Sequence, residues 1–171
     1  ALPNVYPGYQ AVAVPANQEK FEKAWNCKLD NKVGITITEM IDGAYDGSVK
    51  AIYVMGENPY LSDPDQTHVE AAFNKVDFMV VQDMFITETA EFADVILPAA
   101  AYAEKDGHFT NTERRVQRIN KIIEAPAGVK TDWEIIQLIA NAMGSDWNYQ
   151  NVREITKEIN EIDSAEDLIN N

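Results

Sequence analysis

Three short apolar runs constrain the fold of this 171-residue chain more than any other feature. The runs cover residues 51–55, 78–81 and 95–97, and helical patterns separate them. Strands that alternate with helices are typical of βαβ units with a parallel sheet. Because the runs are apolar throughout, we expect helices on both faces of that sheet. The sequence therefore predicts an α/β fold with an open, mainly parallel sheet, whose ligands would bind at the carboxyl ends of the strands.

The segments between and beyond these runs carry helix and turn signals. Capping-box spacing and apolar periodicity predict helices over 17–27, 36–45 and 131–143, a short one over 88–92 capped by Thr87, and three that begin at Ser62–Pro64, Asn151 and Ser164. Residues 107–124 mix apolar and polar side chains and predict a small β-hairpin. We expect one α/β domain over residues 1–171, with a C-terminal helical extension over 145–171.

The cysteine count and the net charge exclude several functions. The only cysteine is Cys27, so the chain holds neither an internal disulfide nor a four-cysteine iron–sulfur site. The net charge of −14 argues against a nucleic-acid partner, and no apolar run is long enough for membrane insertion. We expect a cytoplasmic location. The first residue is Ala1 rather than Met, which favours a processed chain or a fragment.

Polar residues follow the first two apolar runs. Asn58 lies in a Gly-Glu-Asn-Pro loop before a helix, where it offers both a donor and an acceptor, although a plain Asn-Pro turn is the simpler interpretation. Gln82 and Asp83 end the second run, and a carboxylate there can accept two hydrogen bonds from guanine. Capping of the following turn by Asp83 is an equally good interpretation.

Two charged residues lie farther along the chain. Lys105 comes shortly after the third run, where an ammonium can reach a phosphate or a base carbonyl. Asp132 stands in the first turn of the helix over 131–143, which its charge alone would favour. Taken singly, a surface ion pair and a helix-end charge are the simpler interpretations. The two histidines, His68 and His108, show no metal-ligand spacing, so we expect no metal site and no catalytic residue.

Several short motifs occur together in the order typical of a known family. They are Met55–Pro59, Val80–Asp83, Thr87–Ala90, Ala93–Pro98, Glu104–Gly107, Phe109–Arg118 and Thr131–Trp133. This set resembles the molybdopterin oxidoreductase family, and within it most of all the α subunit of molybdenum- or tungsten-dependent formate dehydrogenase. The first ten residues also resemble a segment of that subunit. The resemblance covers nearly the whole chain and weakens after about Gly144.

The resemblance implies a Rossmann-like domain that grips one arm of a molybdopterin guanine dinucleotide. It implies contacts to this cofactor at Asn58, Ser62, Gln82, Asp83, Lys105 and Asp132. Gln82 and Asp83 would face the ribose or guanine, Lys105 and Asp132 would complete the nucleotide pocket, and Asn58 would fix the nearby loop. Ser62 would add a hydroxyl.

The chain also departs from the family pattern. It has neither the family's clustered iron–sulfur cysteines nor the cysteine or selenocysteine that binds the metal, and the β-rich C-terminal domain does not follow. The resemblance therefore implies an internal domain of a larger subunit, inactive alone and without bound cofactor. The parent would hold the molybdenum or tungsten and an iron–sulfur cluster, oxidise formate to carbon dioxide, and assemble with electron-transfer subunits. The alternatives to a formate dehydrogenase parent are a nitrate reductase or another family member, such as the large subunit of respiratory complex I. A further alternative is a non-catalytic subunit-interaction domain.

Overall fold

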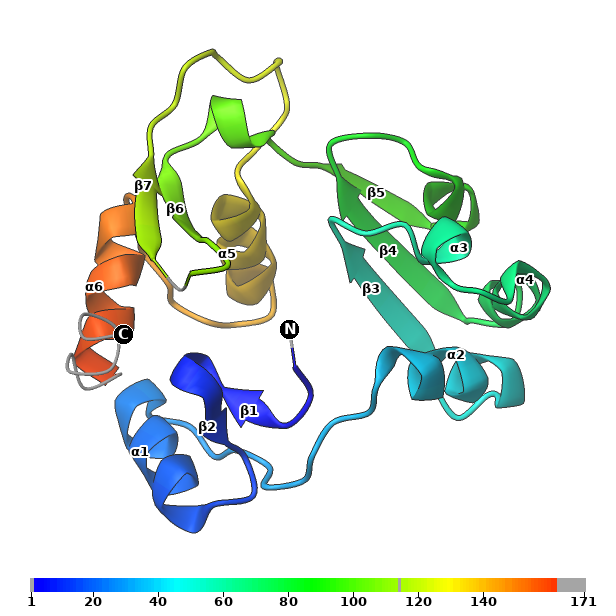
Figure 1. Cartoon of the computed structure of the whole chain (residues 1–171), viewed down its shortest axis with the longest axis horizontal. Helices are drawn as coiled ribbons and strands as arrows, with labels where there is room; N and C mark the ends of the chain where they lie inside the picture. The colour runs from blue at the N-terminus through cyan, green and yellow to red at the C-terminus, as the bar shows by residue number, and fades with distance from the viewer. Residues whose placement is uncertain (1, 114, 163–171) are drawn as a thin grey trace. The chain divides into compact units, whose positions relative to one another are not determined.

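A computed structural model describes residues 2–113 and 115–162 of the chain (Figure 1). The chain divides into two compact units, which are described separately. The first consists of residues up to 36, residues 108–117 and residues from 149 onward, and the second of residues 37–107 and 118–148. The single α/β domain with an extension over 145–171 stays a prediction.

The second unit contains the predicted parallel sheet. Its strands are β3 (Ala51–Met55), β4 (Phe78–Asp83) and β5 (Val95–Pro98), in the order β3-β4-β5. Between β3 and β4 the chain forms α3 (Pro59–Ser62) and α4 (Gln66–Phe73), and between β4 and β5 it forms the 3₁₀ helix η2 (Glu88–Phe92). The parallel pairing and the alternating helices confirm the predicted α/β fold with a parallel sheet.

The hydrophobic core lies on one face of this sheet. Helix α2 (Ile37–Asp46) and helix α4 cover that face, and the buried cluster comprises Ile41, Ala44, Val54, Val69, Ala72, Phe73, Met79, Val81 and Ala90 (Figure 1). Met79 and Val81 belong to it because alternate residues of a strand point to the same face. The opposite face carries Val80 and Gln82, both buried, and side chains that remain partly exposed: Tyr53, Met55, Phe78 and Val95.

The start of α4 differs from the prediction. The expected helix with Pro64 at its first position is wrong, because α3 ends at Ser62 and α4 begins only at Gln66. Asp63 accepts a hydrogen bond from the backbone of Asp65 at 2.9 Å, and Asp65 in turn accepts one from the backbone of His68 at 3.1 Å. Short aspartate side chains thus form a turn and then an N-cap, in competition with a continuous helix.

The other predicted elements of the second half are present. β6 (Gly107–Thr110) and β7 (Val116–Ile119) form a two-stranded sheet, preceded by the 3₁₀ helix η3 (Tyr102–Glu104). Helix α5 (Asp132–Ala142) begins after Thr131, as its capping box predicts. Helix α6 (Val152–Ile162) follows Asn151, whereas the helix predicted from Ser164 lies outside the described residues.

The first unit has its own small core. It contains the hairpin β1 (Val5–Tyr6) and β2 (Gln10–Ala11), with the 3₁₀ helix η1 (Pro7–Tyr9) between them, and helix α1 (Pro15–Trp25). Phe21 of α1 is fully buried and stacks against Tyr6 and Trp25. Helix α1 begins at Pro15, two residues before the predicted start, because proline is well suited to the first helical position. Strands of two residues are too short for an apolar pattern, and neither was predicted.

Candidate functional site

Three of the expected site residues come together in the second unit. Gln82, the fifth residue of β4, is fully buried, and its Nε2 donates a hydrogen bond to Asp132 Oδ1 at 2.8 Å. Lys105 Nζ forms an ion pair with Asp132 Oδ2. Asp132 is the first residue of α5, and the Thr131–Glu134 capping box fixes where that helix begins. The end of a sheet strand and the start of a helix thus meet at one carboxylate.

The Lys105–Asp132 pair is partly open to solvent. The side chains are 22% and 35% exposed, whereas Gln82 beneath them has no exposed surface. Each oxygen of an ionised carboxylate can accept a second hydrogen bond, and an ammonium group has three donors. The pair can therefore bind a polar ligand that presents donors to Asp132 and an acceptor to Lys105.

Tyr53 also belongs to the hydrogen-bonded cluster of Gln82, Lys105 and Asp132, although no sequence pattern predicted it. Its hydroxyl donates a hydrogen bond to Gln82 Oε1 at 2.5 Å. Burial raises the pKa of Tyr53, and the negative charge of Asp132 raises it further, so the hydroxyl stays a donor. The signal that could have found Tyr53 is the strand register. Met55 pairs with Gln82, so Tyr53 is the diagonal neighbour of Gln82 on the same face.

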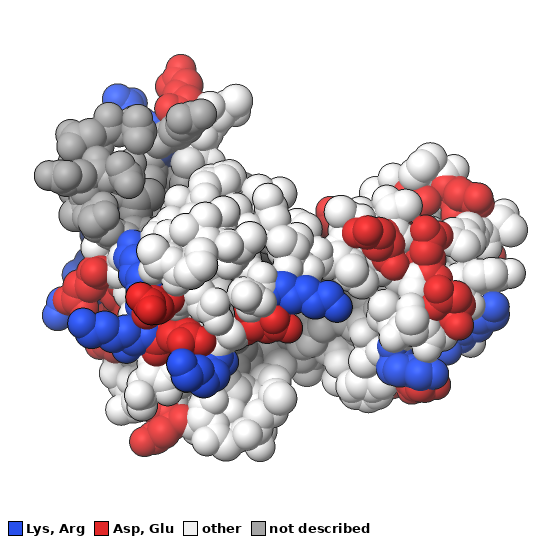
Figure 2. All heavy atoms as spheres, turned by 90° about the horizontal axis from the view of Figure 1, so that it is seen from below, with Lys and Arg blue, Asp and Glu red and all other residues white. Residues whose placement is uncertain are grey.

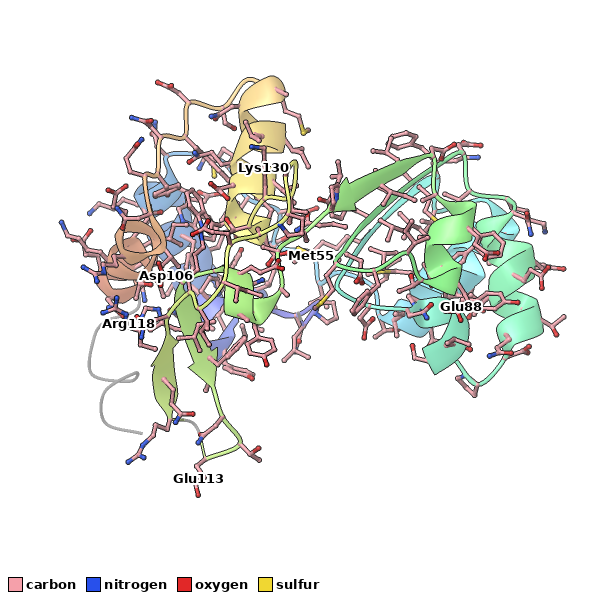
Figure 3. All side chains as sticks on the ribbon, turned by 90° about the horizontal axis from the view of Figure 1, so that it is seen from above. Met55, Glu88, Asp106, Glu113, Arg118 and Lys130 are labelled. Carbon is pink, nitrogen blue, oxygen red and sulfur yellow. The ribbon has the colours of Figure 1, made fainter. Side chains whose placement is uncertain are left out.

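Asn58 connects α3 to η2 instead of facing the Lys105–Asp132 pair. Its Oδ1 accepts hydrogen bonds from the backbone and the hydroxyl of Thr89, at 3.2 and 2.7 Å, and its Nδ2 donates to Glu88 at 2.7 Å. The carboxylate of Glu88 accepts bonds from its own backbone N–H and from Asn58, and both lower its pKa. Figure 3 labels Glu88 on this short helix. Through these hydrogen bonds, Asn58 fixes the loop between β3 and α3 to η2.

Asp83 and Ser62 take no part in the described hydrogen bonds of the cluster formed by Tyr53, Gln82, Lys105 and Asp132. Asp83 Oδ1 accepts a hydrogen bond from the backbone of Phe85 at 3.0 Å, which is the turn-capping alternative raised from the sequence. Ser62 is the exposed last residue of α3. Among residues 2–113 and 115–162, no hydrogen bond joins either side chain to Lys105 or Asp132.

An apolar hollow of about 230 Å³ lies where β5 ends and α5 begins its second turn. It is lined by Leu97, Pro98, Gly128, Lys130, Ile135, Leu138 and Ile139. Lys130, labelled in Figure 3, also forms a parallel bridge with Ala99, directly after β5. Its single cation and its apolar walls offer little to orient a nucleotide, so the Lys105–Asp132 pair remains the better candidate site.

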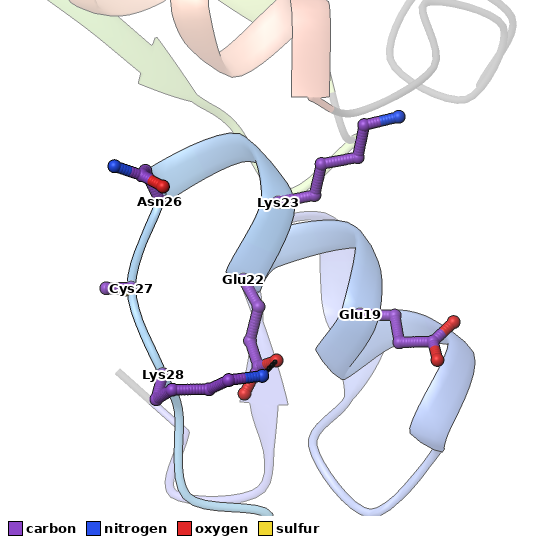
Figure 4. A pocket seen from close by; sticks show the side chains of 6 residues that line it. All are labelled: Glu19, Glu22, Lys23, Asn26, Cys27 and Lys28. Atoms are coloured by element: carbon purple, nitrogen blue, oxygen red, sulfur yellow. Dashed lines mark hydrogen bonds and ion pairs between the residues drawn. The ribbon is translucent and has the colours of Figure 1, made fainter.

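The first unit has a broader and more polar hollow. Figure 4 shows the six residues that line it, at the end of α1: Glu19, Glu22, Lys23, Asn26, Cys27 and Lys28. Glu22 and Lys28 form an ion pair at 2.8 Å, and this contact, first of all, lowers the pKa of Glu22. Because these opposite charges already pair with each other, the hollow does not present a charged surface of one sign.

Neither a metal centre nor a membrane span is found in the part of the chain that the structure describes. No group of three or more His, Cys, Asp or Glu side chains in this part could hold a metal ion. No helix in the same part combines the length and apolar character needed to cross a bilayer. Figure 2 shows acidic and basic side chains interspersed on the face in view, not a basic surface.

Comparison with known proteins shows the family to which this chain belongs. The sequence model of the family described as molybdopterin oxidoreductase matches residues 4–142, which is most of the chain. The chain therefore belongs to the molybdopterin oxidoreductase family.

Two relatives within that family are formate dehydrogenase α subunits. The chain is 52% identical to the F420-dependent formate dehydrogenase 1 subunit alpha of Methanococcus maripaludis over 161 residues. It is 51% identical to the F420-dependent formate dehydrogenase subunit alpha of Methanocaldococcus jannaschii over 164 residues. These alignments cover 93% and 95% of the chain but 23% and 24% of the relatives. The chain thus spans about a quarter of the length of the proteins it resembles.

A solved structure supports the fold. The chain is similar to acetylene hydratase from Pelobacter acetylenicus, with a TM-score of 0.58 and 24% identity. The similarity covers 77% of this chain and 19% of that structure. At this level of identity the likeness concerns the fold alone.

Proposed function

We propose that this chain is the part of a formate dehydrogenase α subunit that binds one molybdopterin guanine dinucleotide. The observation that carries the proposal is the Lys105–Asp132 pair, held by buried Gln82 beside the end of a parallel strand. Family membership and the two formate dehydrogenase relatives support the choice of cofactor and of parent enzyme.

The chemistry of the pair suits the guanine end of that cofactor. Guanine presents an N1–H and an amino group side by side, and one carboxylate can accept a hydrogen bond from each. It also presents a carbonyl oxygen, which an ammonium group can reach. Asp132 and Lys105 supply this carboxylate and this ammonium, and both side chains are partly exposed. Adenine lacks the N1–H and the carbonyl, so the same pair would select against it.

The other expected residues take different roles in this proposal. Gln82 is fully buried, so it acts on the nucleotide through Asp132 rather than by direct contact. Asp83 shapes the turn after β4 and keeps one carboxylate oxygen for the ribose. Asn58 fixes the loop between β3 and α3 to η2, and the hydroxyl of Ser62 adds a donor at the end of α3.

The parent protein would be longer than this chain and would carry the remaining machinery. The bound metal and pterin supply the two-electron oxidation of formate to carbon dioxide, with molybdenum or tungsten as the metal. The residues of this chain bind and orient the nucleotide end. The metal ligand and the iron–sulfur cysteines would lie in other domains of the subunit, with electron-transfer subunits as partners in the cytoplasm. The chain alone is then expected to oxidise no formate, and formate-dependent dye reduction by the purified chain would contradict this.

The test is the cofactor content of the complete subunit after one substitution. Asp132→Ala removes the carboxylate, so guanine nucleotide released by acid treatment and metal per subunit are both expected to fall several-fold. Asp77→Ala is the matched control, because Asp77 directly precedes β4 at the opposite end of that strand and its side chain pairs with Lys50 in an exposed ion pair at 3.8 Å. Unchanged nucleotide and metal in the Asp132→Ala protein would refute the proposal.

A further inference from the structure

Tyr53 and Gln82 meet on the face of the sheet that lies opposite the main core. They come from neighbouring parallel strands, with Tyr53 paired to Val80 and Gln82 two residues farther along β4. A long tyrosine side chain spans such a diagonal, and the hydroxyl reaches Gln82 Oε1 at 2.5 Å. The residue as a whole is 44% exposed, so the tyrosine contributes little to the core at this point.

The hydrogen-bond partners fix the orientation of the Gln82 amide. The ionised carboxylate of Asp132 can only accept, so the group that faces it is the NH₂. The carbonyl oxygen of the amide then faces Tyr53, whose hydroxyl must donate. Without that donor, a fully buried oxygen would lose its only hydrogen-bond partner among the described residues, and a rotated amide would place an oxygen against the carboxylate.

We propose that Tyr53 is a positioning residue for the nucleotide pocket, which acts through Gln82 to hold the Asp132 carboxylate where Lys105 and a guanine meet it. The chain of contacts runs from the Tyr53 hydroxyl to the Gln82 amide, then to Asp132 and Lys105. Tyr53 itself touches no ligand in this arrangement. The identity of the ligand rests on the proposed function, whereas the orientation of Gln82 by Tyr53 does not.

The first experiment measures the Gln82 side chain in the full chain by NMR. Tyr53→Phe keeps the ring and removes the hydroxyl. Loss of one hydrogen bond is expected to speed exchange of the Gln82 side-chain amide protons about tenfold and to move their resonances. Tyr45→Phe is the matched control, because Tyr45 is also 44% exposed and lies on α2 away from the cluster. Gln82 amide signals that are the same in both variants and in the wild type would overturn the inference.

The second experiment measures guanine nucleotide retained by the complete subunit. Tyr53→Phe is expected to lower retention several-fold, by less than Asp132→Ala does, and Tyr45→Phe is expected to retain the wild-type amount. If Tyr53→Phe alters the Gln82 signals but retains all its nucleotide, the positioning role is refuted while the proposed function stands. If Asp132→Ala also retains its nucleotide, it is the proposed function that fails. The two failures are therefore distinguishable.

Discussion

Glu134 shows how one carboxylate fixes the start of α5 and so the place of Asp132. Its side chain accepts hydrogen bonds from the hydroxyl and the backbone N–H of Thr131, at 2.6 and 2.9 Å. The Thr131 hydroxyl is the main cause of a lowered pKa for Glu134, the backbone N–H adds to it, and burial opposes both. Ionised Glu134 therefore stabilises the folded state in a pH-dependent way.

The sign of this effect gives a prediction for acid pH. Because the pKa of Glu134 is lower when folded, its contribution is complete above the ordinary value of 4.5 and is lost as pH falls through the folded-state pKa. Glu134→Gln keeps the shape of the cap without the charge. We expect the wild type to exceed this variant in unfolding free energy most at pH 7, and the difference to shrink below about pH 4.5. Urea unfolding at several pH values measures it, and a difference that is constant between pH 7 and 3 would contradict the prediction.

At the level of single residues, Gln82, Lys105 and Asp132 come together among the six expected site residues, and the roles assigned to all six stay predictions. Lys105 and Asp132 are 27 positions apart, and only the family resemblance brought them into one pocket. Tyr53 was missed because its role depends on a strand register that no local pattern contains. The turn bond of Asp83 was foreseen as an alternative, since aspartate commonly bonds its backbone two residues on.

At the level of elements, the close approach of α2 to the segment before β3 depends on Gly43. A Cβ atom at this position would lie 2.7 Å from Val49 Cγ2 and 3.0 Å from Ser48 Oγ. The backbone N–H of Val49 also donates to the carbonyl of Gly43 at 2.9 Å. The segment between helix and strand therefore folds back against the last turns of α2.

Gly43→Ala is consequently expected to destabilise the chain, although alanine favours helix formation. Overpacking costs about 1–3 kcal/mol, which exceeds the gain of about 1 kcal/mol in helix propensity. In a Val49→Ala background the clashing methyl group is gone, so the same substitution should cost less. Denaturant unfolding of the wild type, both single variants and the double variant measures the difference. Equal effects of Gly43→Ala in the two backgrounds would show that Val49 does not set the cost.

The elements differ in how well their patterns predicted them. The three parallel strands are found within one residue of the apolar runs at 51–55, 78–81 and 95–97, except that β4 continues to Asp83. Each run combines β-prone apolar side chains with turn residues after it, so its strand signal is strong, although of the three strands only β4 is mostly buried. The region between β3 and β4 was predicted wrongly, because hydrogen bonds of Asp63 and Asp65 decide where the helices stop and start.

At the level of the whole molecule, each unit has a core of its own. Phe21 is fully buried between Tyr6 and Trp25 in the first unit, with ring centroids 4.7 and 4.8 Å away. Val81 is fully buried in the sheet core of the second. Two separate cores allow the units to open separately.

Phe21→Ala should therefore weaken the first unit selectively. A cavity of this kind costs about 3–5 kcal/mol where the site cannot collapse. We expect faster amide hydrogen exchange in α1 and little change in β4, and the reverse pattern for Val81→Ala. Mass spectrometry of peptides from the two units measures both. Equal acceleration in the two units would show that they open as one.

The cluster around Asp132 also has a consequence for the biogenesis of the protein. Tyr53 and Gln82 are 29 positions apart, Gln82 and Asp132 are 50, and Lys105 and Asp132 are 27. A ribosome must therefore synthesise the chain past residue 132 before the contacts can all form. A ligand that binds only the completed cluster, as the proposed nucleotide would, can therefore bind only after this segment is made, and its binding would draw newly made chains toward the folded state.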